Sequence, residues 1–203
     1  CEDCRLQPKI FSQITTAVTE WAKENDLTIY NEAENKGFLR HIYIRKAAKT
    51  GEIMVCLVIN GDFLPESAAL VEKLQGICGD DLQSVQININ KKDTNVILGD
   101  TCKTIYGSDY ITDILCGVKV RLSPLSFYQV NHTMAEKLYE KAKEYANPVG
   151  KNIIDLYCGA GTIGLSMADK VKTLVGVEII PEAIENAKEN AKQNGVENAR
   201  FIC

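Results

Sequence analysis

Residues 152–180 read NIIDLYCGAGTIGLSMADKVKTLVGVEII, and this stretch decides the fold of the C-terminal part of the chain. An apolar run is followed by Gly159–Gly164, which fits G-x-G-x-x-G, then by a helical pattern and a second apolar run, TLVGVEI. A strand, a glycine loop that opens a helix and a second strand are typical of a parallel, doubly wound α/β sheet. A further helical pattern at 181–195 and a third strand that begins at 199–203 continue this order.

The glycine loop predicts a nucleotide-type cofactor, and two acids beside it favour S-adenosylmethionine (SAM). Asp155, four residues before Gly159, can face the ammonium or sulfonium of SAM but would repel a pyrophosphate. Glu178 ends the second strand, where an acid accepts hydrogen bonds from ribose hydroxyls, a feature that NAD(P) enzymes share. SAM is therefore favoured, while NAD(P) and a purely structural βαβ unit remain alternatives. A carboxylate that serves a helix end or a loop is the alternative interpretation of Asp155.

The rest of the chain predicts a separate, antiparallel α+β domain, with strand-like runs between two helical patterns and after them. We expect an N-terminal helix and possible cluster-cysteine segment at 1–26, a central α+β domain at 27–124 and a partial, Rossmann-like methyltransferase domain at 125–203. Helices are predicted over 8–25, 65–77 and 126–146. The apolar side of the first carries Ile10, Ile14, Val18 and Trp21, and that of the last carries Met134, Leu138, Ala142 and Tyr145. A doubly wound domain has about five to seven strands. Because this chain stops within the third strand, we expect a fragment of a longer protein.

The composition excludes several classes of protein. The chain has 203 residues, of which 45% are hydrophobic and 25% charged, which argues against disorder, collagen and a disulfide miniprotein. No apolar run approaches the roughly 20 residues of a membrane span, and no signal-peptide pattern is present, so we expect no membrane association. A net charge of −4 excludes a whole-surface grip on nucleic acid but not a local basic patch. Eight cysteines without a secretory pattern favour a cytoplasmic protein.

Cys1 and Cys4 form a C-x-x-C pair at the start of the sequence. No second pair follows, as a zinc site would need. Two interpretations stay open: incidental thiols, or a cysteine of an iron–sulfur cluster whose other ligands lie upstream of this chain.

Three motifs follow one another along the chain and make the cofactor prediction more specific. They are S-F-Y-Q-V-N at 126–131, D-L-Y-C-G-A-G at 155–161 and Val177-Glu178, followed by Asn190 and Asn194-Gly195 in the next helix. Together with Gly37–His41 and Cys4–Gln7, these segments resemble the RumA/TrmA-type RNA uracil-5-methyltransferases. The resemblance covers nearly the whole chain but only the middle of the family's length.

The resemblance implies SAM as cofactor and a possible 4Fe–4S cluster in the full-length parent, with Cys4 favoured over Cys1 as a ligand. It implies that Gln129, Tyr157, Thr162 and Glu178 contact SAM, in one cofactor site with Asp155, Gly159 and Gly161. In this family a cysteine thiolate adds to uracil C6, the SAM methyl is transferred to C5, and a carboxylate removes the C5 proton. The S-C-N-P and D-P-P-R segments that carry this chemistry do not occur here. We therefore nominate no catalytic residue and expect this fragment alone to be inactive.

The resemblance also implies RNA as the partner. We expect 23S rRNA, because a cluster cysteine points to that branch of the family, and tRNA stays open. A basic stretch with interleaved His41 and Tyr43 is a candidate RNA contact, with a solvated hairpin as the alternative; its basic residues are Lys36, Arg40, Arg45, Lys46 and Lys49. No obligate protein partner is predicted. An NAD(P)-dependent oxidoreductase fragment and a noncatalytic RNA-binding module remain the competing functions.

Overall fold

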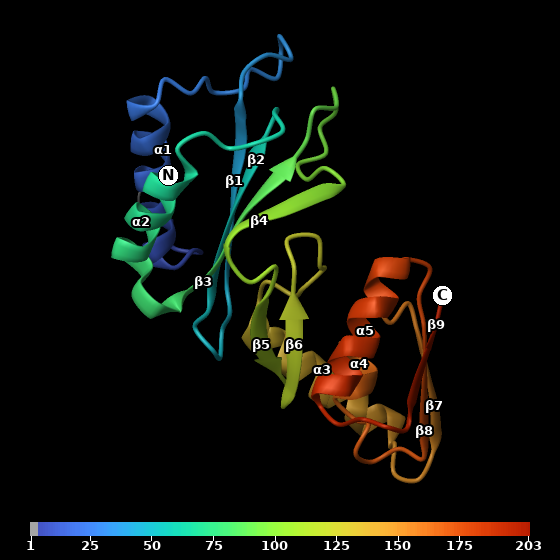
Figure 1. Cartoon of the computed structure of the whole chain (residues 1–203). Helices are drawn as coiled ribbons and strands as arrows, with labels where there is room; N and C mark the ends of the chain where they lie inside the picture. The colour runs from blue at the N-terminus through green and yellow to red at the C-terminus, as the bar shows by residue number, and fades with distance from the viewer. Residues whose placement is uncertain (1–3) are drawn as a thin grey trace. The chain divides into compact units, whose positions relative to one another are not determined.

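The computed structural model describes residues 4–203, which divide into two units (Figure 1). Unit 1 contains residues 4–46 and 51–111, and unit 2 contains 47–50 and 112–203. The division therefore lies before the expected boundary at residue 124. Residues 111–122, which we expected within the central domain, form a two-stranded hairpin sheet of their own, and this hairpin contacts a helix of unit 2. An alternating pattern identifies a strand but does not say which sheet the strand joins.

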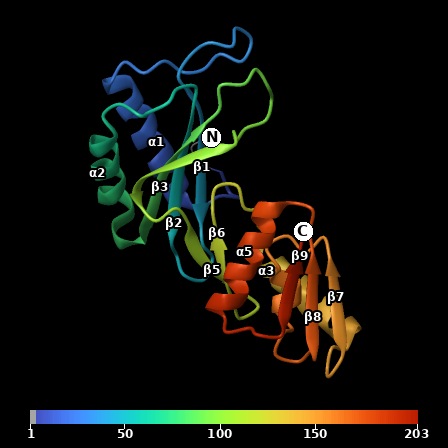
Figure 2. The ribbon, with the colours of Figure 1, turned by 45° about the vertical axis from the view of Figure 1, so that its right-hand side comes forward.

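Unit 1 is a four-stranded sheet with two helices on one face (Figures 1 and 2). Its elements are α1 (Lys9–Glu24), β1 (Leu39–Lys46), β2 (Ile53–Ile59), α2 (Ser67–Cys78), the short 3-10 helix η1 (Gly79–Asp81), β3 (Leu82–Ile89) and β4 (Thr101–Gly107). The strands lie in the order β1-β2-β3-β4. The outer pairs are antiparallel, but β2 and β3 are parallel, so the expectation of a purely antiparallel sheet is wrong. Helix α2 supplies the crossover that a parallel pair needs.

The core of unit 1 lies between the helices and the sheet. Ile14, Val18 and Trp21 of α1 are fully buried, which confirms the predicted apolar stripe. They pack with alternate side chains of β2, from Ile53 to Ile59, and with the buried leucines of α2. The Trp21 indole N–H donates to the Glu66 carbonyl at 3.3 Å, so this large side chain is buried without losing its hydrogen bond.

Unit 2 contains a parallel sheet preceded by the small hairpin. Its elements are β5 (Ile111–Leu115), β6 (Val118–Leu122), α3 (His132–Ala146), β7 (Asn152–Leu156), α4 (Thr162–Leu165), β8 (Thr173–Val177), α5 (Pro181–Gln193) and β9 (Ala199–Ile202). Strands β7, β8 and β9 are parallel and lie in chain order (Figure 2). This arrangement confirms the predicted α/β class and Rossmann-like order. None of the helices in residues 4–203 combines the length and the apolar character that a membrane crossing requires.

Helix α3 differs from its prediction in both its start and its buried face. It begins at His132 rather than near 126, because the Asn131 side chain accepts a hydrogen bond from the Met134 N–H at 3.1 Å and caps the helix there. The expected apolar side is exposed, with Leu138 60% accessible. The buried side is formed by His132, Ala135 and Tyr139.

Candidate cofactor site

The glycine loop, residues 157–164, lies at the carboxyl ends of β7 and β8, where Leu156 pairs with Val177. Three of its residues, Tyr157, Gly159 and Gly161, have left-handed φ values of 59°, 53° and 77°. The Cys158 N–H donates to the Val177 carbonyl at 3.1 Å, and the Gly161 N–H donates to the Cys158 carbonyl at 2.8 Å. The loop is thus a tight turn joined to the end of β8. Left-handed φ favours glycine, so Tyr157 is held in a strained conformation.

Glu178, directly after β8, is oriented by the loop. Its carboxylate accepts hydrogen bonds from the Gly159 N–H at 3.1 Å and the Ile180 N–H at 3.0 Å. The Ile180 and Gly159 N–H groups stabilise the ionised form and lower the pKa of Glu178. This acid is therefore an ionised acceptor with a fixed direction beside the loop.

A cavity of about 270 Å³ opens in unit 2 over the glycine loop. One wall is the extended segment Leu125–Gln129, and the others are the loop and the first turns of α5. Of the predicted site residues, Gln129, Tyr157, Gly159 and Thr162 line this cavity. The Gln129 side chain makes no hydrogen bond within residues 4–203, and the Tyr157 side chain is 88% exposed. Both side chains are consequently accessible to a ligand.

Thr162 is connected to a residue that the sequence analysis did not single out. Its hydroxyl shares a hydrogen bond of 2.9 Å with the Tyr139 hydroxyl of α3, and Tyr139 also lines the cavity. Burial raises the pKa of Tyr139, so its phenol is neutral and able to donate. The start of α4 is fixed in this way by a helix some 20 residues earlier in the chain.

Gly161 and Asp155 belong to the framework of the loop rather than to the cavity lining. A Cβ at Gly161 would lie 2.9 Å from a ring carbon of Phe201 and 3.2 Å from the Ala187 Cβ. The Asp155 carboxylate accepts from the Gly164 N–H at 3.0 Å, and burial raises its pKa. This contact agrees with the alternative in which Asp155 serves a helix end.

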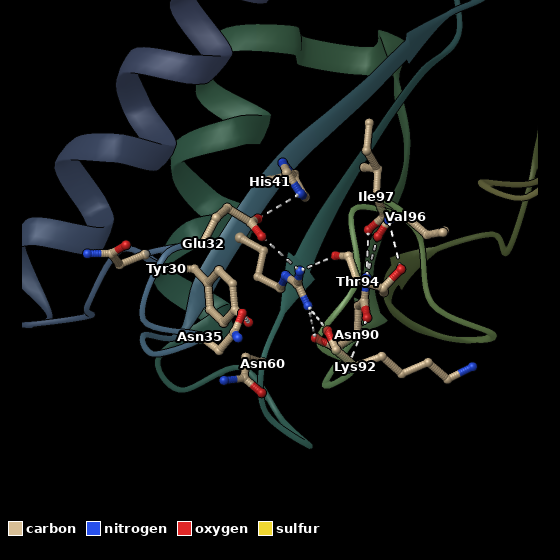
Figure 3. Close-up of polar contacts among 12 residues, drawn as sticks. Tyr30, Glu32, Asn35, His41, Asn60, Asn90, Lys92, Thr94, Val96 and Ile97 are labelled. Carbon is tan, nitrogen blue, oxygen red and sulfur yellow. Dashed lines mark hydrogen bonds and ion pairs between the residues drawn. The ribbon is translucent and has the colours of Figure 1, made fainter.

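Arg40, at the centre of the predicted basic stretch, is a structural residue of unit 1. Its side chain is fully buried, and its guanidinium donates to carbonyls of three residues of the β3–β4 loop, which are labelled in Figure 3. These are Asn90 at 3.1 Å, Lys92 at 2.8 Å and Thr94 at 3.1 Å. The guanidinium also lies 4.1 Å from the centroid of the Tyr30 ring. Arg40 is therefore not available to RNA, and its assignment as an RNA contact is wrong.

The other members of the basic stretch have mixed surroundings. Lys46 lies 3.6 Å from Asp81, and Lys49 lies 3.4 Å from Glu136. The Arg45 guanidinium lies over the Tyr43 ring. Lys36 is exposed and pairs with Asn31 in a β-bridge that closes a turn. Their contact with RNA stays a prediction.

No metal centre accompanies this site in the part of the chain that the structure describes. Residues 4–203 contain no group of three His, Cys, Asp or Glu side chains arranged to hold a metal ion, and Cys4 is a free cysteine. Cys1 lies outside the described residues. Cys158 lines the cavity, but burial raises the pKa of its thiol to about 11. A thiol with this pKa is a poor nucleophile at neutral pH.

Comparison with known proteins agrees with the geometry. A family model described as a methyltransferase domain matches residues 148–203. An uncharacterized RNA methyltransferase of Caldanaerobacter subterraneus is 41% identical over 203 residues, and one of Clostridium acetobutylicum is 46% identical over 206 residues. Each alignment covers 99% of this chain and 44% of the relative. The chain thus spans less than half the length of the curated relatives that it matches.

A solved structure is similar over both units. The Pyrococcus abyssi tRNA (uracil-54, C5)-methyltransferase, in complex with S-adenosyl-L-homocysteine (SAH), has a TM-score of 0.81 and 27% identity. The match covers 96% of this chain and 45% of that one. The resemblance to RNA methyltransferases that the motifs predicted is confirmed along the whole chain. The NAD(P) alternative has no counterpart among these matches.

Proposed function

We propose that this chain is the central and cofactor-binding part of a SAM-dependent RNA methyltransferase that forms 5-methyluridine. The observation that carries the proposal is the cavity of unit 2, which Gln129 lines together with a glycine loop whose Gly159 N–H orients Glu178. The relatives named above are RNA methyltransferases, and the P. abyssi enzyme is described as acting on uracil C5. These matches support the same activity for the whole protein.

The residues around the cavity fit SAM. When bound, SAM supplies an electrophilic methyl group on a sulfonium. Each Glu178 oxygen accepts one backbone N–H and keeps a lone pair for a ribose hydroxyl. The unengaged Gln129 carboxamide can bond the amino-acid end of the cofactor, and the exposed Tyr157 ring offers an aromatic surface to its positive charge. We propose that Gly159 and Thr162, which line the same cavity, are also part of the SAM site.

The finer parts of the proposal rest on the motif resemblance. We propose 23S rRNA as the substrate, and we propose that the chain alone transfers no methyl group. The raised pKa of the Cys158 thiol supports the second statement, since this cavity cysteine is held as the thiol. A 4Fe–4S cluster finds no ligand set within residues 4–203, so we derive no step that uses one.

Calorimetric titration of the chain with SAH, with NADH in parallel, tests the cofactor assignment. We expect saturable binding of SAH alone, weakened about tenfold or more by Glu178→Ala and by Gln129→Ala, because each change removes a hydrogen-bonding group. Glu185→Ala is the matched control, because Glu185 is an exposed residue of α5 whose only ion pair among residues 4–203 is with Lys188. Binding of NADH alone, or SAH binding that neither Glu178→Ala nor Gln129→Ala weakens, would contradict the proposal.

A further inference from the structure

Helix α5 and its C-cap residue Asn194 carry three side-chain amides that contact the neighbouring backbone of unit 2. Gln193 donates to the Lys119 carbonyl at 2.7 Å. Asn194 accepts from the Lys119 N–H and donates to the Lys119 carbonyl, both at 2.8 Å. Lys119 belongs to β6, whose only strand partner in the described structure is β5. The amides of α5 therefore satisfy the second edge of β6, as a neighbouring strand would.

The third amide, Asn190, reaches the cofactor loop as well. Asn190 is fully buried. Its Nδ2 donates to the Ala160 carbonyl at 3.0 Å, and its Oδ1 accepts from the Arg121 N–H at 3.0 Å and from Gln193 at 3.0 Å. Ala160 lines the cavity. One carboxamide thus connects the glycine loop to β6.

We infer that Asn190 is a positioning residue that fixes the glycine loop for the cofactor, an inference that rests on the proposed SAM site. The loop contains three residues with left-handed φ, and such conformations persist only where the surroundings determine them. Helix α5 meets the loop at two points on one side: Ala187 packs against Gly161, and Asn190 holds Ala160. Asn190 does not line the cavity and acts through the backbone.

The chemistry of the contact requires a carboxamide. Asparagine donates at one atom and accepts at the other, and both functions are used here. An aspartate at this position, when ionised, would set a carboxylate oxygen against the Ala160 carbonyl. When protonated, it would donate to that carbonyl again. Asn190→Asp should therefore lose the loop contact as the pH rises and regain it as the pH falls.

The test measures the SAH affinity of wild type, Asn190→Asp and Asn194→Asp by calorimetry from about pH 5.5 to 8.5. This is the range in which a buried carboxyl titrates. Asn194→Asp is the matched control, because the Asn194 side chain accepts from the Lys119 N–H just as the Asn190 side chain accepts from the Arg121 N–H. Among the described residues, however, Asn194 makes no hydrogen bond to the glycine loop. The charged groups on the elements that Asn190 contacts, which include Arg121 and Glu189 with Asp155 and Glu178 beside the loop, occur in all three proteins. Their titration cancels when each dissociation constant is divided by that of wild type.

For Asn190→Asp we expect the SAH dissociation constant, divided by that of wild type, to rise about tenfold or more as the pH increases. The same ratio for Asn194→Asp should not change with pH. Hydrogen–deuterium exchange without SAH should be faster in residues 157–161 for Asn190→Asp only. A flat ratio with unchanged loop exchange would overturn the inference. If Asn190→Asp does not fold, Asn190→Ser replaces it, and wild-type SAH affinity in that variant would also overturn it. If wild type binds no SAH, the proposed function fails, and the exchange comparison alone decides the role of Asn190.

Discussion

Replacing Gly161 by alanine should destabilise unit 2 by about 2–5 kcal/mol, whereas the same change at Gly159 should cost about 1–2 kcal/mol. Both glycines have left-handed φ, 77° and 53°, so either alanine incurs the left-handed penalty of about 1–2 kcal/mol. An added Cβ at Gly161 would also lie 2.9 Å from the Phe201 ring and 3.2 Å from the Ala187 Cβ. Such crowding costs a further 1–3 kcal/mol, roughly. At Gly159 nothing lies within 4 Å of the added carbon.

Urea unfolding followed by far-UV circular dichroism separates the two variants. With a denaturant slope of about 2 kcal/mol per molar, a difference of about 1–3 kcal/mol moves the midpoint by about 0.5–1.5 M. Trp21, the only tryptophan of the chain, lies in unit 1, so its fluorescence reports on that unit separately. Equal midpoints for Gly161→Ala and Gly159→Ala would refute the reasoning that contact with α5 and β9, and not φ alone, requires glycine at 161.

Two further outcomes are expected. Arg40→Leu should lower the free energy of unfolding by about 3 kcal/mol, because it leaves three loop carbonyls without their buried donor. Urea unfolding followed by Trp21 fluorescence measures this decrease. A decrease below about 1 kcal/mol would contradict the structural role of Arg40. The pKa of Glu178 in the folded chain lies below its ordinary value of 4.5, so its contribution to stability is complete above pH 4.5 and is lost as the pH falls through the folded value. Thermal unfolding of Glu178→Gln should therefore show a smaller acid-dependent decrease in Tm than wild type, and identical acid profiles would argue against this linkage.

The helices show what hydrophobic periodicity can and cannot predict. In α1 the buried face is apolar, and the spacing of Ile14, Val18 and Trp21 identified it correctly. In α3 the buried face contains His132 and Tyr139, whose polar atoms are satisfied by the Ile114 carbonyl at 2.8 Å and the Thr162 hydroxyl at 2.9 Å. These partners lie outside the helix, so a pattern that weighs only the apolar character of side chains selects the wrong face. The parallel pairing of β2 with β3 was missed for a related reason, since pairing depends on the path of the chain between strands.

The candidate site was predictable where one local segment determines it. The glycine loop, the strand before it and Glu178 lie within 27 residues, and spacing was sufficient to bring them together. Tyr139 and Asn190 were not singled out as site residues, because their roles depend on contacts with Thr162 and Ala160 about 20 to 30 residues away. The only sequence sign of Asn190 was its place in a motif, to which no role had been attached.

The two acids of the motif show why residue type alone could not assign their roles. Both were expected to face the cofactor. Glu178 accepts two backbone N–H groups that lower its pKa, so it stays ionised and directional. Asp155 accepts the Gly164 N–H, and burial outweighs that bond and raises its pKa. Glu178, whose two oxygens are oriented by backbone N–H groups, is therefore the acid suited to the ribose, whereas Asp155, which bonds the Gly164 N–H, is suited to hold α4 beneath the loop.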